Sequence, residues 1–239
     1  DVYKRQAKKG QRKNGRNRLN FFSWCSKCPQ SVSEVQILID DKRTALLEST
    51  VRAVAKYGMK DISTRNISSD AGVNDAYIYR YFENKEDLLV QAYLLENHKF
   101  MHHVIRQIDL VRKQMSACPL PERCRLVFHA AWRYLIDTPD VCRFFTYYYH
   151  SPNFEKYAQK EYQIQLDELA ETILPRFDTM EDAKHCLYAL FVLLNSFAIL
   201  VVNQETPDEA DAENRAFNTA FYVIEAEMKK ELPEKADRQ

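Results

Sequence analysis

The segment that decides the fold is "ISTRNISSDAGVNDAYIYRYFENKEDLL", Ile62 to Leu89. Ser63 and Asn74 are residues that favour the N-cap of a helix, and Gly72 between them favours the end of one. Asn84 can cap a further helix. These signals predict a short helix, a tight turn and a second short helix, followed by a long helix.

The second short helix carries four aromatic residues in six positions, Tyr77 to Phe82. At about 100° per residue, Ile78, Tyr81 and Phe82 fall on one face and are expected to pack in the core. The remaining arc consists of Ala76, Tyr77, Tyr79 and Arg80. Two hydroxyls and a guanidinium around a small alanine suit a surface that enters a DNA groove, because they can donate to phosphates and base edges.

Two cations lie where a helix dipole disfavours them. Arg65 and Lys85 each lie in the first turn of a predicted helix, where a positive charge costs about 0.3–1 kcal/mol. An external anion would offset this cost, since helix N-termini bind phosphate. We therefore expect the two helix starts to lie on either side of the aromatic helix and to contact DNA across the major groove. The alternative is that both side chains simply extend into water.

The whole segment resembles the helix-turn-helix of the TetR/AcrR family of bacterial transcriptional regulators, over roughly Ala45 to Leu94. The positions in register with the family's pattern are Ser63-Thr64-Arg65, Ile67, Ala71-Gly72-Val73, Ile78-Tyr79, Tyr81-Phe82 and Lys85-Glu86. The resemblance implies an all-α protein, with a three-helix DNA-binding domain followed by a six-helix regulatory and dimerisation bundle. The chain departs from the pattern at Asp75, where a lysine is common, and at Ala76-Tyr77, where a small residue followed by threonine is common.

The resemblance also implies roles for single residues. Thr64, Tyr79 and Lys85 would contact phosphates, and Ser63, which caps the helix that bears Thr64, would belong to the same DNA-binding set. The residues at or near bases would be Arg65, Asn74, Asp75, Ala76, Tyr77 and Arg80. Because phosphate would repel Asp75, this residue would either accept a hydrogen bond from a cytosine amino group or only cap its helix.

Charge divides the chain, although its net charge is zero. Residues 1–30 hold nine lysines and arginines and one acid. We expect residues 1–36 to be a basic, disordered arm. It is either a salt-sensitive contact to nucleic acid, or else a solvated extension or one foreign to the protein. Residues 37–92 would then be the DNA-binding domain and residues 93–239 the ligand-binding and dimerisation domain.

Helical spacing and capping signals account for most of the chain from residue 37 onward, and no strand is expected. The first helix is expected from Asp40 or Asp41 to about Tyr57, with Gly58 as its stop. The later long helices are expected over residues 85–114, 121–137, 139–149, 153–174, 180–204 and 208–231.

No motif for catalysis is found. Cys25-Ser-Lys-Cys28 has only half of a zinc-knuckle spacing, and Glu96 with His98 and His102 gives only a fragment of a di-metal helical motif. We therefore expect no enzymatic activity, cofactor or metal, with an α-helical metalloenzyme as a distant alternative. Scattered cysteines without a secretory signal predict reduced thiols and a cytoplasmic protein.

An uncharged run of 17 residues extends from Cys186 to Val202. A membrane span needs about 20 residues, so a helix buried in the subunit and against a partner is expected, and no membrane contact. The resembled family forms dimers through its last two helices, which implies a homodimer. The interface residues we expect are Leu190, Leu194, Phe197, Phe217, Phe221 and Ile224.

The segment from Trp132 to Phe154 is dense in aromatic residues. Some of these rings are expected to line a ligand cavity between helices, where tyrosine hydroxyls orient the ligand. Asn195 needs a hydrogen-bond partner, so it either lines this cavity or pairs with its symmetry mate. The expected lining residues are Trp132, Phe145, Tyr148, Tyr149, Phe154, Tyr188 and Asn195. The alternative is that the rings only pack.

The residues and the resemblance together predict a sequence-specific DNA-binding transcriptional regulator. We expect a repressor that binds a palindromic double-stranded operator as a homodimer and is released by a mostly apolar, weakly charged small molecule. The alternative is an effector-independent DNA- or partner-binding adaptor on the same scaffold. The presence of a ligand site separates the two hypotheses.

Overall fold

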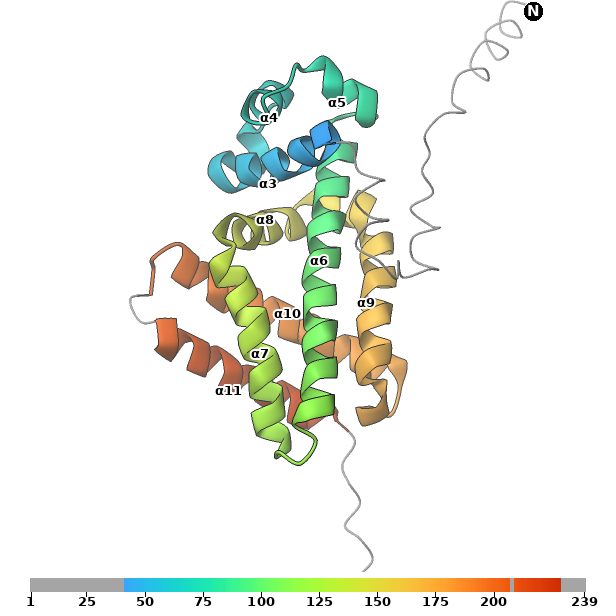
Figure 1. Cartoon of the computed structure of the whole chain (residues 1–239), viewed down its shortest axis with the longest axis vertical. Coiled ribbons are helices and arrows are strands. Elements are labelled where there is room, and N and C mark those ends of the chain that lie inside the picture. Colours follow the sequence, from blue (N-terminus) through green and yellow to red (C-terminus); the bar gives the residue numbers. More distant parts are fainter. Residues whose placement is uncertain (1–40, 207–208, 229–239) are drawn as a thin grey trace, which may run out of the picture. The chain divides into compact units, whose positions relative to one another are not determined.

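The computed structural model describes residues 41–206 and 209–228 (Figure 1). Within these ranges every regular element is helical. The first three helices are α3 (Asp41–Asp61), α4 (Thr64–Asp70) and α5 (Ala76–Tyr81). They are followed by α6 (Lys85–Gln114), α7 (Leu120–Asp137), α8 (Pro139–Tyr149), η1 (Phe154–Ala158), α9 (Gln159–Ile173), η2 (Leu174–Arg176), α10 (Met180–Val202) and α11 (Glu209–Glu227).

The all-α class and the order of three helices followed by six are confirmed for the described residues. The predicted arm over residues 1–36, with Cys25 and Cys28, lies outside them, as does the predicted end of the last helix at residue 231. The proposed boundary at residues 92 and 93 falls inside the continuous helix α6. The buried apolar residues likewise form one contiguous cluster from α3 to α11.

One predicted helix stop is found in place and one expected helix is divided. Gly58 leaves the helical conformation (φ 73°, ψ 175°), as the sequence predicts, and a further helical segment included in α3 follows it up to Asp61. The helix expected over residues 153–174 is divided into η1, α9 and η2. Pro175 lies in η2 and has no amide hydrogen to continue the α-helical ladder, which explains the change after Ile173.

Hydrogen bonds fasten α4 to α3 and fix the start of α6. The Ser49 hydroxyl donates to the Ile67 carbonyl at 2.6 Å. At the start of α6, Asn84 accepts from the Asp87 amide at 2.8 Å, and Asp87 accepts from the Glu83 amide at 2.9 Å. This reciprocal cap satisfies amides that a helix start leaves without partners, so both ends of the helix-turn-helix are anchored.

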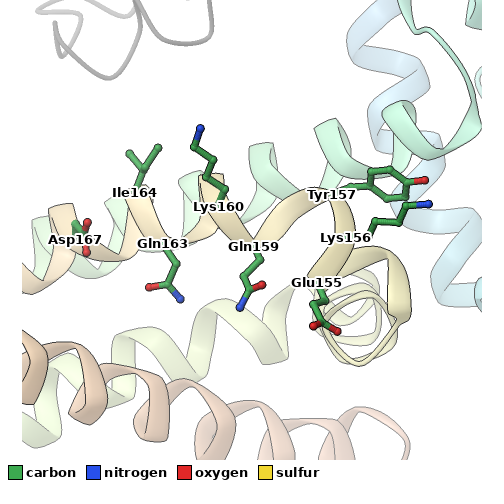
Figure 2. A pocket seen from close by; sticks show the side chains of 8 residues that line it. All are labelled: Glu155, Lys156, Tyr157, Gln159, Lys160, Gln163, Ile164 and Asp167. Atoms are coloured by element: carbon green, nitrogen blue, oxygen red, sulfur yellow. The ribbon is translucent and has the colours of Figure 1, made fainter.

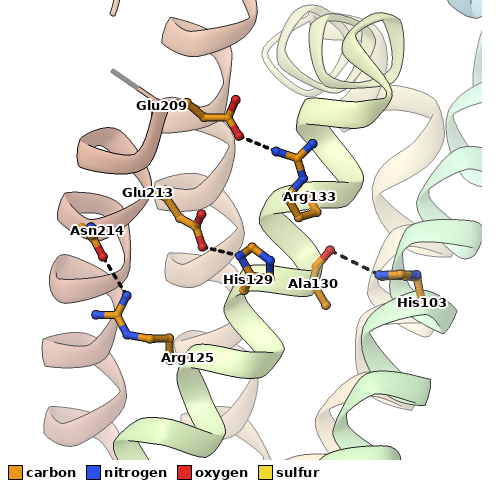
Figure 3. Close-up of polar contacts among 8 residues, drawn as sticks. All are labelled: His103, Arg125, His129, Ala130, Arg133, Glu209, Glu213 and Asn214. Carbon is orange, nitrogen blue, oxygen red and sulfur yellow. Dashed lines mark hydrogen bonds and ion pairs between the residues drawn. The ribbon is translucent and has the colours of Figure 1, made fainter. Parts of the chain in front are cut away.

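A row of polar pairs fastens the last helix to α7 (Figure 3). The pairs are Arg125–Asn214, His129–Glu213 and Arg133–Glu209. The α7 members are four residues apart and therefore share one face of that helix. Arg125 also lies over the Phe217 ring, 4.1 Å from its centroid, so polar and aromatic contacts together hold α11.

Candidate nucleic-acid interface

The turn between α4 and α5 has the capping chemistry that the sequence predicts. The Ser63 hydroxyl accepts from the Asn66 amide and caps α4. Gly72 has φ 66°, in the left-handed region that residues with a Cβ rarely adopt. Asn74 Oδ1 accepts from the Ala76 amide at 2.9 Å at the start of α5. These contacts fix how α5 leaves the turn.

The two faces of α5 are divided as the helical wheel predicts. Ile78 and the following Phe82 are buried, and Tyr81 is partly buried. Ala76 and Arg80 are exposed, and Tyr79 keeps 64% of its surface accessible. A tyrosine so exposed contributes little to the core, so its ring and hydroxyl are available to a partner.

Tyr77 makes contacts within the protein, although the helical wheel places it on the outward face of α5. Its hydroxyl accepts from the Lys42 ammonium at 2.8 Å, and that ammonium lies 4.2 Å from the centre of the Tyr77 ring. The Tyr77 ring also stacks on Tyr81, with centroids 6.3 Å apart. The Arg80 guanidinium lies 6.0 Å from the Tyr77 centroid and 5.8 Å from the Tyr81 centroid. Sequence reasoning missed Lys42, because it lies 35 positions before Tyr77 and only the fold brings the two together.

Asp75 is tied to the preceding helix. Its Oδ1 accepts from the hydroxyl of Ser68 on α4, so the carboxylate links the two helices of the motif. The sequence left open whether Asp75 contacts a cytosine or only caps α5, and Asp75 makes no side-chain capping bond to α5. The structure gives it a third role, which sequence reasoning missed.

The residues predicted to contact phosphate lie at two helix starts. Thr64 and Arg65 are in the first turn of α4, Thr64 partly buried and Arg65 exposed. Lys85 begins α6, and its Nζ donates to the carbonyl of Ile62 at 3.4 Å. The ammonium therefore lies beside the start of α4. The expectation that the two starts contact DNA on either side of α5 stays a prediction.

The predicted ligand residues are mostly core residues. Trp132, Phe145, Tyr148 and Phe154 are buried. Tyr93 of α6 joins three of them, with its ring centroid 4.8 Å from Tyr148, 5.4 Å from Phe154 and 5.7 Å from Phe145. Packing therefore explains their density without a ligand.

A cavity of about 160 Å³ nevertheless lies between α8 and α10. Tyr149 and Asn195 line it, as the sequence predicts, and Asn195 Oδ1 also accepts from the Cys142 thiol at 3.7 Å. Tyr188 is exposed and does not line the cavity, and its ring contacts that of Tyr149. The lining residues that sequence reasoning missed are Thr146, His150, Phe191, Val192, Ser196 and Ile199. The α10 members follow helical spacing around Asn195, which is the signal that could have found them.

Several polar atoms of the aromatic core are buried without a hydrogen-bond partner among the described residues. They are the hydroxyls of Tyr93, Tyr148 and Tyr162 and the indole nitrogen of Trp132. Burial raises the pKa of Tyr93 and Tyr162 well above the usual value for tyrosine and keeps these phenols neutral. Each orphaned polar group costs about 1–3 kcal/mol, so a bound molecule that pairs with them would be stabilised.

A larger hollow of about 480 Å³ lies along η1 and α9 (Figure 2). Its walls include Glu155, Lys156, Lys160 and Asp167, all from one stretch of chain. A ligand site normally gathers residues from several elements around an apolar interior, so this hollow does not fit an apolar effector. Within residues 41–206 and 209–228, no three His, Cys, Asp or Glu side chains are placed to share a metal ion.

The predicted interface residues on α10 and α11 fall into two groups. Leu194 and Phe217 are buried inside the subunit and are therefore removed from the expected interface. The residues that stay partly exposed are Leu190, Phe197, Phe221 and Ile224. Leu200 and Tyr222, which were not predicted, are 37% and 74% exposed. The exposed apolar surface of α10 and α11 therefore includes Leu200 and Tyr222, which the sequence did not single out.

By length and composition, α10 could also cross a membrane, the one such helix in the described part of the chain. It has 23 residues and a mean hydropathy of 2.2 in its most apolar window, of which 28% is buried. Its N-terminal cap is a complete capping box between Thr179 and Asp182, typical of a helix that begins in water. The helix ends two residues before the expected end at residue 204, and most of its apolar window is not fully buried within the subunit.

Comparison with known proteins is consistent with this geometry. Residues 46–92 match the family of bacterial regulatory proteins, tetR family. An uncharacterized HTH-type transcriptional regulator of Haemophilus influenzae is 26% identical over 115 residues, which are 48% of this chain and 58% of that relative. The match to this relative thus spans less than two thirds of its length.

Two solved structures share the fold. A TetR family transcription regulator from Marinobacter aquaeolei VT8 has a TM-score of 0.59 at 21% identity, over 80% of this chain and 97% of its own. The fatty acid degradation regulator FadR from Bacillus halodurans has a TM-score of 0.51 at 21% identity, over 78% of this chain and 96% of its own. Residues 46–92 thus match a helix-turn-helix domain of the tetR type, and the rest of the described chain shares the fold of these regulators.

Proposed function

We propose that the protein is a cytoplasmic repressor that binds a palindromic operator through the exposed face of α5. The observation that carries the proposal is the outward presentation of Tyr79 and Arg80 around Ala76 on a helix fixed by capping at its turn. A guanidinium can pair with the edge of guanine in the major groove, and a phenol can donate to phosphate. Base contacts are assigned to Arg80, Tyr77 and Ala76.

The phosphate contacts are assigned to the corner between α4 and α6. Thr64, Arg65 and Lys85 supply a hydroxyl and two cations there, and Tyr79 adds a hydroxyl from α5. Asn74 and Asp75 position α5 through the Ala76 amide and through Ser68. Contacts to phosphate fix the register of a protein on DNA, and contacts to bases select the sequence.

A homodimer through α10 and α11 completes this proposal, because a palindrome needs two α5 helices related by two-fold symmetry. The support is the apolar surface left on these helices, including Phe197, Leu200 and Ile224. Light scattering should give twice the chain mass of 28.2 kDa. Leu200→Glu on α10 should give monomers, whereas Glu225→Lys, at an exposed position of α11, should remain dimeric. A wild-type monomer at micromolar concentration would refute the dimer.

The effector is a small, mostly apolar molecule with one or two polar groups. The support is the cavity between α8 and α10 together with the orphaned hydroxyls of Tyr93, Tyr148 and Tyr162. A cavity of about 160 Å³ is smaller than the roughly 300–1,000 Å³ of ordinary ligand sites, so binding must displace aromatic rings. Displaced α8 rings would shift α6, which packs on α8 and carries Lys85 at its start.

The second candidate is an adaptor without an effector, favoured by the close packing of the rings around Tyr93. A thermal-shift screen of small apolar compounds separates the two functions, because a ligand of the native state raises the melting temperature. A compound that stabilises the wild type, fails to stabilise Asn195→Leu and releases DNA supports the repressor. If no compound does so, the adaptor replaces it.

Selection from a random-sequence duplex library tests the DNA-binding proposal itself. Repeated capture by the wild-type protein should enrich a two-fold symmetric motif whose half-sites lie about 34–36 Å apart. Affinity for an enriched duplex should fall steeply with salt, because phosphate contacts release counterions. Failure to enrich any symmetric motif would sink the proposal.

A further inference from the structure

Lys42 links the first described helix to the recognition surface. It lies in the first turn of α3 and is itself exposed, and its ammonium reaches both the hydroxyl and the ring face of Tyr77 on α5. The Nζ–Oη distance is 2.8 Å, and the Nζ lies 4.2 Å from the ring centroid. Two simultaneous contacts restrict a side chain more than either alone, so Lys42 fixes both the rotation and the hydrogen-bonding role of Tyr77.

The chemistry of the pair sets the direction of that role. An ammonium has only donors, so the Tyr77 oxygen acts as the acceptor in this contact. A hydroxyl that accepts from a cation becomes a stronger donor and a poorer acceptor for a second partner, because hydrogen bonds in a chain polarise one another. Tyr77 is thereby biased to donate rather than accept when it meets a base edge.

The neighbouring side chains extend this bias over the whole face. The Arg80 guanidinium, which also has only donors, lies near the rings of Tyr77 and Tyr81. Asp75, the acidic residue beside them, accepts from Ser68 on α4. The α5 face therefore presents donors to DNA and holds its carboxylate against α4.

We propose that Lys42 is a specificity-determining positioning residue that makes Tyr77 a hydrogen-bond donor to acceptor atoms in the major groove. These atoms are purine N7, guanine O6 and thymine O4. This inference rests on the proposed DNA contact of α5 and adds which base edges it selects. The cytosine amino group considered from the sequence is not among them.

Lysine variants on one helix test the inference in parallel library selections. Lys42→Met keeps the stem and removes the ammonium, and Tyr77→Phe removes the acceptor. Lys56→Met is the matched control, because Lys56 also lies on α3 over a tyrosine ring, 5.0 Å from the centroid of Tyr57. Lys42→Arg keeps a cationic donor and serves as the rescue. Lys42 and Lys56 are both exposed, so all variants should fold alike.

The readout is the base preference at each position of the enriched motif. Lys42→Met and Tyr77→Phe should each lower discrimination about five- to thirty-fold at the same base pairs, as expected for one lost base contact. The double variant should lose no more than either single one, since both remove one interaction. Lys42→Arg should retain the preference, and Lys56→Met should match the wild type.

Two outcomes would overturn the inference while leaving the proposed function intact. One is a Lys42→Met motif identical to that of the wild type. The other is loss at base pairs that Tyr77→Phe does not affect. Absence of any motif with the wild type would overturn the inference and the proposed function together.

Discussion

The helices α5 and α8 are both dense in aromatic residues, yet their rings lie in opposite environments. On α8, Phe144, Phe145 and Tyr148 are fully buried, whereas Tyr79 on α5 is 64% exposed. Neighbours make the difference: α8 packs against α6, α7 and α10, while the main neighbour of α5 is the short α4. Ring density alone therefore does not distinguish a core helix from a recognition helix, and the cations around the rings do.

The largest expected effect is on the free energy of unfolding, which should fall for a substitution on α8 and not for one on α5. Phe145→Ala should lower the free energy of unfolding by about 3–5 kcal/mol, because it leaves a cavity in a packed core. Tyr79→Ala should change it by less than about 0.5 kcal/mol, as for most surface substitutions. Urea denaturation followed by circular dichroism measures both. Similar losses in the two variants would break the comparison.

The next effect is on DNA binding, where a substitution on α5 should matter although it leaves stability unchanged. Arg80→Ala should weaken binding to an enriched duplex by about 1–3 kcal/mol and relax the preference at one base pair. The folded structure should keep its stability, because Arg80 is exposed. Fluorescence anisotropy gives the affinity, with the exposed Arg106 of α6 as the control position for Arg106→Ala. A loss shared by both variants would point to nonspecific charge instead.

A smaller gain in stability is expected from the orphaned hydroxyls near α8. Tyr162→Phe removes a buried hydroxyl that has no partner among the described residues, so the ligand-free protein should gain up to about 1 kcal/mol. Tyr157→Phe, at an exposed tyrosine, is the control and should be neutral. Thermal unfolding of both variants provides the measurement. Destabilisation by Tyr162→Phe would mean that the hydroxyl already has a partner.

The smallest effect concerns a ring pair on α6. His98 and His102 lie with centroids 4.1 Å apart, and burial, with a smaller contribution from His102, lowers the pKa of His98 to about 4. Between this value and the usual pKa of about 6.5 the unfolded chain binds the proton more readily, so stability should fall as the pH drops through that range. His98→Gln should flatten the decline, whereas the exposed His185→Gln should not. Parallel denaturation curves for wild type and His98→Gln would contradict this.

The sequence predicts local features better than contacts between distant segments. Capping by Ser63 and Asn84 and the wheel of α5 depend on residues a few positions apart, and the structure agrees with them. The Lys42–Tyr77 contact joins residues 35 positions apart, and Leu194 proved buried in the subunit. The spacing of residues along one helix predicts neither this contact nor this burial, because both depend on how whole helices pack.

Tyr79 of α5 and Lys85 of α6 are expected to bind the DNA backbone together, and this contact is central to the proposed function. Its most direct test is an anisotropy titration of an enriched duplex at moderate salt with the wild type and the Tyr79→Phe/Lys85→Ala double variant. We expect the double variant to bind about thirty- to a thousand-fold more weakly, for the loss of one neutral and one charge-assisted hydrogen bond, and both proteins to melt at the same temperature. Equal affinities for two equally stable proteins would contradict it.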